Sequence, residues 1–309
     1  MINSVRNTVL SVLNKNNYGY ISPSDFNLFA KQAQLDIFED YFYDYNYQVN
    51  KENARTSGTG YADIKKQLEE VIDSLSEEVF LAQSNANTYS LPADYYIINK
   101  LFYYSVLLTS GTNTAIVVNE LVDGAATFTT DNIKVGDIVV NVTDQTQANV
   151  LNIINNTNIG LSADIFPAPL GDAYAIYDGT RIREVERVHQ NRIFNLTNSN
   201  LTAPTTTYPA YVLGGNIVTI YPNTIIGISD IQSQYIRYPL DPKWTFSSLP
   251  NGEPLFDITA LDYQDFELPD ADEPNLINKI LQYAGVSIRE LEVYKVAAQE
   301  ELENTQEEQ

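Results

Sequence analysis

The chain lacks cysteine altogether and has a single histidine, His189. The absence of cysteine excludes disulfide frameworks, thiolate nucleophiles and cysteine-based metal sites. One histidine leaves no second imidazole to complete a zinc set. Cationic side chains are also scarce, with 18 Lys and Arg against 40 Asp and Glu and a net charge of −22. Because this field repels nucleic acid and anionic membranes, any contact with DNA has to be local.

Long apolar runs are missing as well. Residues Met1–Leu13 carry one early Arg6 and no continuous apolar stretch, so we expect neither a signal peptide nor a membrane span. The 309 residues are 44% hydrophobic and 19% charged, which is typical of globular proteins with a substantial core. We therefore expect a protein made in a cytoplasm, with no membrane partner.

Tyrosine is unusually abundant, with 22 copies. It offers a large contact area at a low entropic cost and is enriched in subunit interfaces. The mutation bias of an AT-rich genome also raises the number of Tyr and Asn residues, so both explanations stay open.

The N-terminal region has helical periodicity. One apolar stripe predicts a helix over Asn3–Lys15. A second helix begins at Ser22, with Pro23 in the first helical position and Asp25 near the positive end of the helix dipole. A third amphipathic stretch predicts a helix over Tyr61–Ala82.

The chain becomes mostly β after residue 92, beginning with a strand pair or one long strand over Tyr95–Val106. The segment from Thr112 to Asp178 has one cation, many Thr, Val, Ile and Asn residues, and closely spaced turn signals, which predict a small barrel or sandwich. Gly111 and Gly179 flank it as expected hinges, so residues 111–179 form an inserted β module. Its predicted strands are Ala115–Asn119, Asp137–Thr143, Asn149–Asn152, Asn158–Ser162 and Ala173–Tyr177.

Further strands and a long helix follow the module. An amphipathic helix is expected over Glu273–Glu303, and a hairpin turn at residues 214–216. Residues 1–110 and 180–309 then build one discontinuous core, and the fold class is α+β: a helical N-terminal region, an antiparallel sheet core, the inserted module and the C-terminal amphipathic helix. The later strands are expected at Val185–His189, Tyr208–Leu213, Ile217–Tyr221 and Ile231–Tyr238.

The densest basic cluster consists of Arg181, Arg183, Arg187 and Arg192. On a strand, alternation places the first three on one face together with His189, and Glu184 and Glu186 on the other. The arginines either form ion pairs with these glutamates or with acids on a neighbouring strand, or they contact DNA phosphates or an acidic partner. A catalytic or metal-binding site does not require a cationic strand face opposite an acidic one, so this pattern indicates neither function.

Motifs of known chemistry are absent from the sequence. It has no phosphate-binding loop, dinucleotide fingerprint, nucleophile elbow or two-histidine zinc helix. An acidic cluster near the C-terminus lacks the spacing of a calcium loop and is expected to be a solvated face over Phe266 and Leu268. We predict no catalytic, cofactor-binding or metal-binding residue, and no cofactor. The acidic cluster comprises Asp257, Asp262, Asp265, Glu267, Asp270, Asp272 and Glu273.

Two segments carry a resemblance to proteins of tailed bacteriophages. Residues Thr127–Asp144, followed by Gly171–Tyr177, resemble a small β module that recurs in phage virion proteins. Residues Ile217–Pro222, leading into Tyr235–Trp244, resemble the strand pair of virion proteins near the neck and, more loosely, the tubular gatekeeper proteins of short-tailed phages. The order of helices, β insertion, strand pair and C-terminal helix is similar to that of the ring or connector proteins of crAss-like phages.

The resemblance implies a structural protein, not an enzyme, in the head-to-tail connector of a virion assembled in the host cytoplasm. It implies a closed ring of twelve copies below the portal around the DNA channel. The implied partners are the portal, neighbouring ring or tail proteins and, passively, genomic DNA. The alternatives are a tail hub or other virion structural subunit, a carbohydrate-binding or depolymerising tail protein, and a bacterial surface adhesin.

Overall fold

A computed structural model describes residues 1–13, 21–54, 64–227, 229–250, 252–288 and 299. The fold class is α+β, as predicted, with helices and extended, mainly antiparallel sheets. The chain divides into two compact units. The helical unit comprises Met1–Leu75 and Tyr238–Gln309, and the sheet unit comprises Ser76–Arg237.

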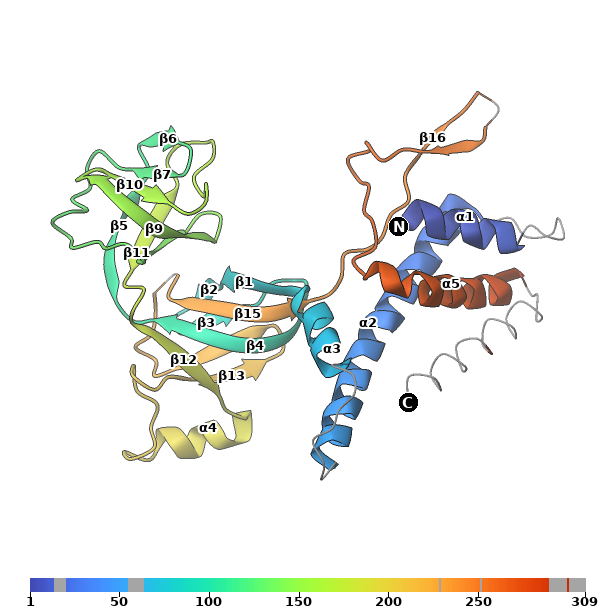
Figure 1. Cartoon of the computed structure of the whole chain (residues 1–309). Helices are drawn as coiled ribbons and strands as arrows, with labels where there is room; N and C mark the ends of the chain where they lie inside the picture. The colour runs from blue at the N-terminus through green and yellow to red at the C-terminus, as the bar shows by residue number, and fades with distance from the viewer. Residues whose placement is uncertain (14–20, 55–63, 228, 251, 289–298, 300–309) are drawn as a thin grey trace. The chain divides into compact units, whose positions relative to one another are not determined.

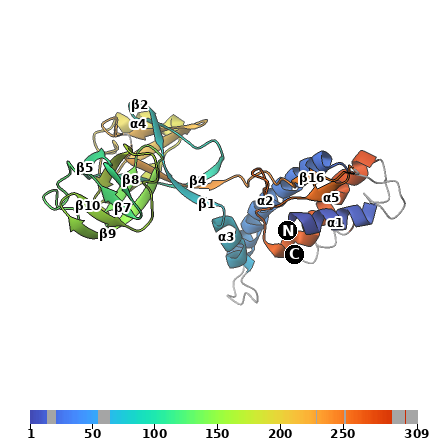
Figure 2. The ribbon, with the colours of Figure 1, turned by 90° about the horizontal axis from the view of Figure 1, so that it is seen from above.

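The helical unit is built around helices from both ends of the chain. Helix α5 packs against α1 and α2, as Figures 1 and 2 show. The core contains apolar side chains of these helices together with Trp244, Phe266 and Leu268, so the last two are buried as predicted. The elements are α1 (Ile2–Leu13), α2 (Pro23–Ala54), α3 (Ile64–Asp73), β16 (Phe246–Ser248), β17 (Pro254–Phe256), η2 (Asp270–Asp272) and α5 (Glu273–Ile288).

The start of α2 follows its sequence signals. Ser22 Oγ accepts a hydrogen bond from the backbone N–H of Asp25 at 3.2 Å, which satisfies one of the free donors of the first turn. Pro23 is the first helical residue, and its missing N–H costs nothing there. Phe26, Ala30 and further residues at helical spacing are buried in the core. The predicted N-terminus of this helix is confirmed.

The third predicted helix, Tyr61–Ala82, is wrong in its second half. Helix α3 ends at Asp73, and the strand β1 (Ser76–Phe80) follows. Strand β1 pairs along its whole length with β15 (Ile231–Arg237), and Phe80 is buried between the two sheets of its unit. These contacts with residues distant in sequence outweigh a local helical pattern. The predicted C-terminal helix is described only to Ile288; 289–298 and 300–303 lie outside the described residues.

The sheet unit contains an eight-stranded sheet with the order β1-β15-β4-β12-β13-β14-β3-β2. Its two edge strands are separated in the chain by Leu81 alone, so the sheet must curl until its ends meet around the core. The predicted turn at residues 214–216 connects β13 and β14: Gly214 ends β13, and Gly215, at φ 64°, and Asn216 form the turn. The remaining strands are β2 (Ala82–Asn85), β3 (Thr88–Ser90), β4 (Tyr95–Tyr104), β12 (Ile182–Arg187), β13 (Ala210–Gly214), β14 (Ile217–Tyr221) and β15 (Ile231–Arg237).

A seven-stranded antiparallel sheet, the β module, is inserted between β4 and β12. Its strand order is β5-β11-β8-β9-β10-β7-β6, and its edge strands β5 and β6 are again neighbours in the chain. The module has its own apolar core, with Phe128, Val139 and Ile176 fully buried. The strands are β5 (Leu107–Thr112), β6 (Ala115–Val117), β7 (Glu120–Val122), β8 (Ile138–Asn141), β9 (Thr146–Asn155), β10 (Asn158–Leu161) and β11 (Ala173–Tyr177).

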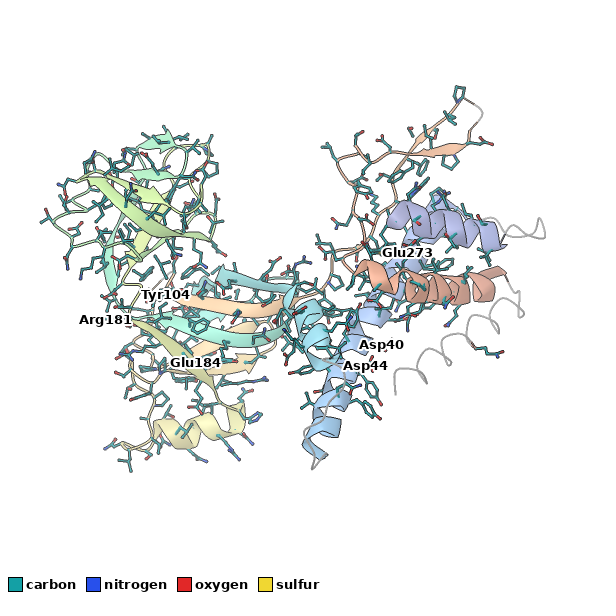
Figure 3. All side chains as sticks on the ribbon, viewed as in Figure 1. Asp40, Asp44, Tyr104, Arg181, Glu184 and Glu273 are labelled. Atoms are coloured by element: carbon teal, nitrogen blue, oxygen red, sulfur yellow. The ribbon has the colours of Figure 1, made fainter. Side chains whose placement is uncertain are left out.

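Tyrosines join the module to the eight-stranded sheet. Tyr104 of β4 packs edge-on against Tyr177 of β11 with ring centroids 5.6 Å apart; Figure 3 labels Tyr104. Tyr177 donates to Asp230 at 3.1 Å. Burial raises the pKa of Tyr177, and the charge of Asp230 adds to the shift, so the hydroxyl stays a donor. Tyr104 and Tyr177 therefore make contacts inside one chain, not in a subunit interface.

The domain boundaries differ from those predicted at residues 110 and 179. The contacts of the chain divide it after Leu75 and after Arg237, so the helices do not share a unit with the eight-stranded sheet. Gly111 lies inside β5 opposite Tyr174 and does not form a terminal hinge. A side chain there would begin 2.7 Å from the Tyr174 hydroxyl and the Asp123 carboxylate, so any other residue would have to displace this hydrogen-bonded pair.

Candidate interaction surface

The four predicted arginines lie on consecutive segments of the sheet unit. Arg181 precedes β12, Arg183 and Arg187 belong to β12, and Arg192 belongs to α4 (Gln190–Thr197). Arg181 forms an ion pair with Asp178 at 3.4 Å. The β12 neighbour Glu184 pairs with Lys100 of β4 at 3.3 Å and with none of the arginines. Figure 3 labels Arg181 and Glu184.

The other three arginines are exposed, and no ion pair is recorded for them among the described residues. Val185 lies between Arg183 and Arg187 on the same side of β12 and is buried in the core of the sheet. The predicted pairing with Glu184 and Glu186 is therefore absent from the described structure, and only Arg181 has the structural role of an ion-pair partner. Three guanidinium groups remain available to a binding partner.

Helix α4 was not predicted from the sequence. It forms the crossover between β12 and β13, the one parallel pair recorded among the described strands, which needs such a connection. The predicted strand to His189 ends instead at Arg187, and His189 becomes the residue before the helix. Ile193 is the buried residue through which α4 packs.

Large apolar side chains are exposed in the segment that follows β12. Phe194 on α4 is 70% exposed, and Leu201 and Tyr208 in the following loop are 95% and 79% exposed. The loop returns to β13, where Pro209 accepts a hydrogen bond from Glu186 of β12. We define the β12–α4 surface as Arg183, Arg187, Arg192, Phe194, Leu201 and Tyr208.

From Arg187 onward, the segment that carries this surface lacks the acidic residues that dominate the rest of the chain, whereas Arg183 is followed by the exposed Glu184 and Glu186 on β12. Residues 187–229 contain no Asp or Glu, although the chain has 40 acidic residues. Burial raises the pKa of Tyr211, and the positive charge of the neighbouring Arg187 opposes that shift. The acid-free run was visible in the sequence and was the signal that could have extended the predicted site beyond the arginines.

Among the described residues, neither His189 nor the cleft beside β1 and β2 shows a catalytic arrangement of side chains. The exposed His189 makes no capping hydrogen bond to α4. A cleft of about 630 Å³ is lined by residues that include Glu77 and Glu78. Glu77 accepts a charged hydrogen bond from Arg237 at 2.6 Å, and Glu78 accepts hydrogen bonds from Gln147 and Gln232. Within the described residues, no three His, Cys, Asp or Glu side chains are grouped to hold a metal ion.

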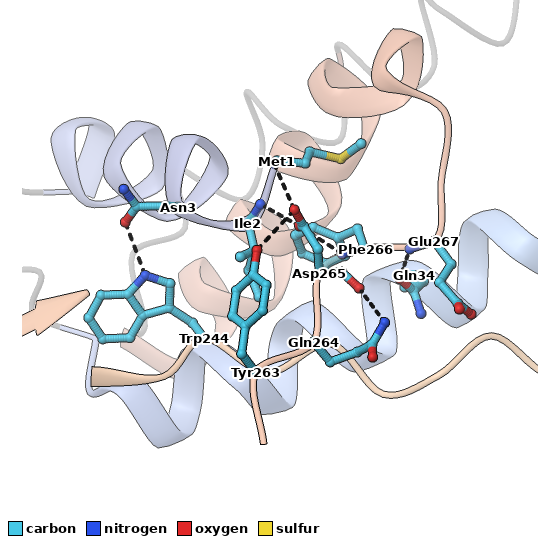
Figure 4. A network of polar contacts seen from close by, with 10 residues as sticks. All are labelled: Met1, Ile2, Asn3, Gln34, Trp244, Tyr263, Gln264, Asp265, Phe266 and Glu267. Atoms are coloured by element: carbon cyan, nitrogen blue, oxygen red, sulfur yellow. Dashed lines mark hydrogen bonds and ion pairs between the residues drawn. The ribbon is translucent and has the colours of Figure 1, made fainter. Parts of the chain in front are cut away.

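The acidic cluster near the C-terminus is more structural than predicted. Asp265 accepts hydrogen bonds from the backbone N–H of Ile2 at 2.7 Å and of Phe266 at 2.8 Å, and pairs with the ammonium group of Met1 at 3.0 Å (Figure 4). Glu267 accepts from the backbone N–H of Leu240 at 2.7 Å. These two carboxylates hold backbone segments in place and do not belong to a merely solvated face.

The Asp265 network predicts a dependence of stability on pH. Burial alone would raise the pKa of Asp265, but the Met1 ammonium and the two backbone donors lower it overall. Because the folded-state pKa lies below the unfolded-state value of about 3.9, this stabilisation is complete well above that pH and is lost as the pH falls through the folded-state pKa.

Asp265→Asn should lower the free energy of unfolding at pH 7 by about 1 kcal/mol, after allowance for solvent screening. The difference from wild type should shrink below about pH 4. Urea unfolding followed by fluorescence of Trp244, in the same unit, measures this. Asp241→Asn, in an exposed pair with Lys31, is the control and should change little. A difference that stays constant down to pH 2 would contradict the assignment.

No protein-family model matches the chain, and the search of curated proteins gives no match. Separately, none of the described helices is both long and apolar enough to cross a membrane.

Proposed function

We propose that the chain is a structural protein of a tailed bacteriophage, where it forms a ring in the head-to-tail connector between portal and tail. The observation that carries the proposal is the resemblance of Thr127–Asp144 and Gly171–Tyr177 to a module of phage virion proteins. In this chain those segments supply buried core residues such as Phe128, Val139 and Ile176. The resemblance therefore lies in residues that build the fold of the module.

Two physical properties support the role. A net charge of −22 would let DNA slide through such a ring, because the acidic lumen and the phosphates repel each other. The exposed arginines and apolar side chains of the β12–α4 surface suit a contact with another protein. The portal and adjacent ring or tail proteins are the proposed partners, and contact with DNA is passive.

Antibody labelling of intact particles tests the position. The proposal predicts gold particles at the neck, where head and tail meet, in virions of the phage that encodes the chain. Label along the tail or at its tip would favour a tail hub or a carbohydrate-binding tail protein. Virions that carry no label, together with protein found only in the infected cell, would contradict a virion role.

A further inference from the structure

The helical unit carries a second surface with exposed apolar side chains. Strands β16 and β17 form a hairpin that continues into residues 257–262, and we name these segments the apolar arm. Five large apolar side chains of and beside this hairpin are exposed. They are Phe246, Leu249, Leu255, Ile258 and Leu261.

The arm is acidic as well as apolar. Residues 246–262 contain Glu253, Asp257 and Asp262 and no Lys or Arg. Asp262 pairs with Lys243 at the base of the arm, at 2.5 Å. Hydrogen bonds from the side chain and backbone of Thr259 lower the pKa of Asp257, so this carboxylate is ionised at neutral pH.

The base of the arm is fixed to the helices. Trp244 exchanges two backbone hydrogen bonds with the Asn27 side chain, at 2.9 and 3.2 Å. Its ring stacks on Phe246 and Phe256, at 5.7 and 5.8 Å between centroids. The arm therefore presents its apolar side chains from an ordered base, and its binding loses less conformational entropy than binding of a free segment would.

We propose that the apolar arm of one copy of the chain binds the β12–α4 surface of a neighbouring copy. This inference rests on the proposed ring and names its subunit contact. The two surfaces are complementary in charge, since one has three exposed arginines and no acidic residue over 187–229, and the other has carboxylates and no cation over 246–262. Both also offer apolar side chains for the centre of an interface.

A contact between two different surfaces of the same chain is head-to-tail and lets identical copies add successively. DNA fits the β12–α4 surface less well. Phosphates would attract Arg183, Arg187 and Arg192, but the duplex backbone offers no apolar partner for Phe194, Leu201 and Tyr208. The acidic field of the chain also opposes DNA binding.

Charge reversal on each surface tests the contact. The full-length chain and its variants are compared by sedimentation velocity and native mass spectrometry over a concentration series, alone and with the portal protein of the same genome. Arg187→Glu with Arg192→Glu, and separately Glu253→Arg with Asp257→Arg, should each weaken self-association at least about tenfold. The chain with all four reversals should regain most of it, because the attraction is restored with opposite signs.

The control is Lys66→Glu with Lys134→Glu, which changes the net charge as much as the arginine pair does and lies outside both surfaces. It should associate like the wild type. Circular dichroism and the melting temperature establish that every variant is folded.

Rings that persist unchanged in both reversed variants would overturn the proposed contact and leave the ring itself standing. Failure of the fourfold variant to regain association would also overturn the pairing of these two surfaces. Arginine variants that assemble normally but lose binding to double-stranded DNA would assign the arginines to DNA. A wild-type chain that stays monomeric with and without the portal would overturn the ring.

Discussion

Replacing Trp244 by alanine should lower the free energy of unfolding of the helical unit by about 3–5 kcal/mol. The ring is 2% exposed, and its indole N–H donates to Asn3 at 3.1 Å. The guanidinium carbon of Arg6 lies 3.7 Å from the ring centroid. The substitution would thus open a cavity and remove an aromatic face from a buried cation.

Urea unfolding followed by circular dichroism at the helical band measures this loss. Leu255→Ala is the matched control, because it removes an exposed apolar side chain from the same arm and should cost less than about 0.5 kcal/mol. Trp244→Phe should lie between the two, since it keeps an aromatic ring and loses the bond to Asn3. A loss below about 1 kcal/mol for Trp244→Ala would contradict the anchoring role of the ring.

Asn141→Ala should destabilise the β module by about 2–4 kcal/mol. This fully buried side chain accepts from the backbone N–H groups of Thr143 and Asp144, at 2.9 and 3.2 Å. It donates to the carbonyl of Ile165 at 2.8 Å and to Asp172 at 3.2 Å. Alanine would remove the Asn141 amide as hydrogen-bond partner of these two N–H groups, this carbonyl and this carboxylate. They lie inside the module, where water cannot easily replace the lost amide.

Hydrogen exchange of peptides from residues 107–177 gives the local stability of the module, which global unfolding of a chain with two units does not. The control is Asn155→Ala, an exposed residue that accepts from Thr157 at 2.8 Å and should cost less than about 1 kcal/mol. Equal protection in the Asn141→Ala variant and the wild type would show that the network does not stabilise the module.

The sequence predicted elements whose signals are local. Ser22 and Pro23 begin α2 because a cap and a proline act within one helical turn. Gly215 and Asn216 make the turn after β13 for the same reason. Strand β11 was predicted with its observed bounds, Ala173–Tyr177, because a short apolar run between two turns is too short for a helix and suits a buried strand.

Elements that depend on distant partners were missed. Strand β1 has a sequence that suits a helix and becomes a strand because β15 and the buried site of Phe80 stabilise it. Helix α4 exists because β12 and β13 are parallel and require a crossover, which no local pattern reveals. The arginines of the candidate surface were predicted, whereas Phe194, Leu201 and Tyr208 became noticeable only through their exposure.

The most direct test of the central claim is native mass spectrometry with negative-stain electron microscopy on the full-length chain, alone and mixed with the portal protein of the same genome. The connector proposal predicts a closed ring, or a complex of fixed stoichiometry that forms only with the portal. A monomer that remains stable at high concentration and does not bind the portal would contradict it.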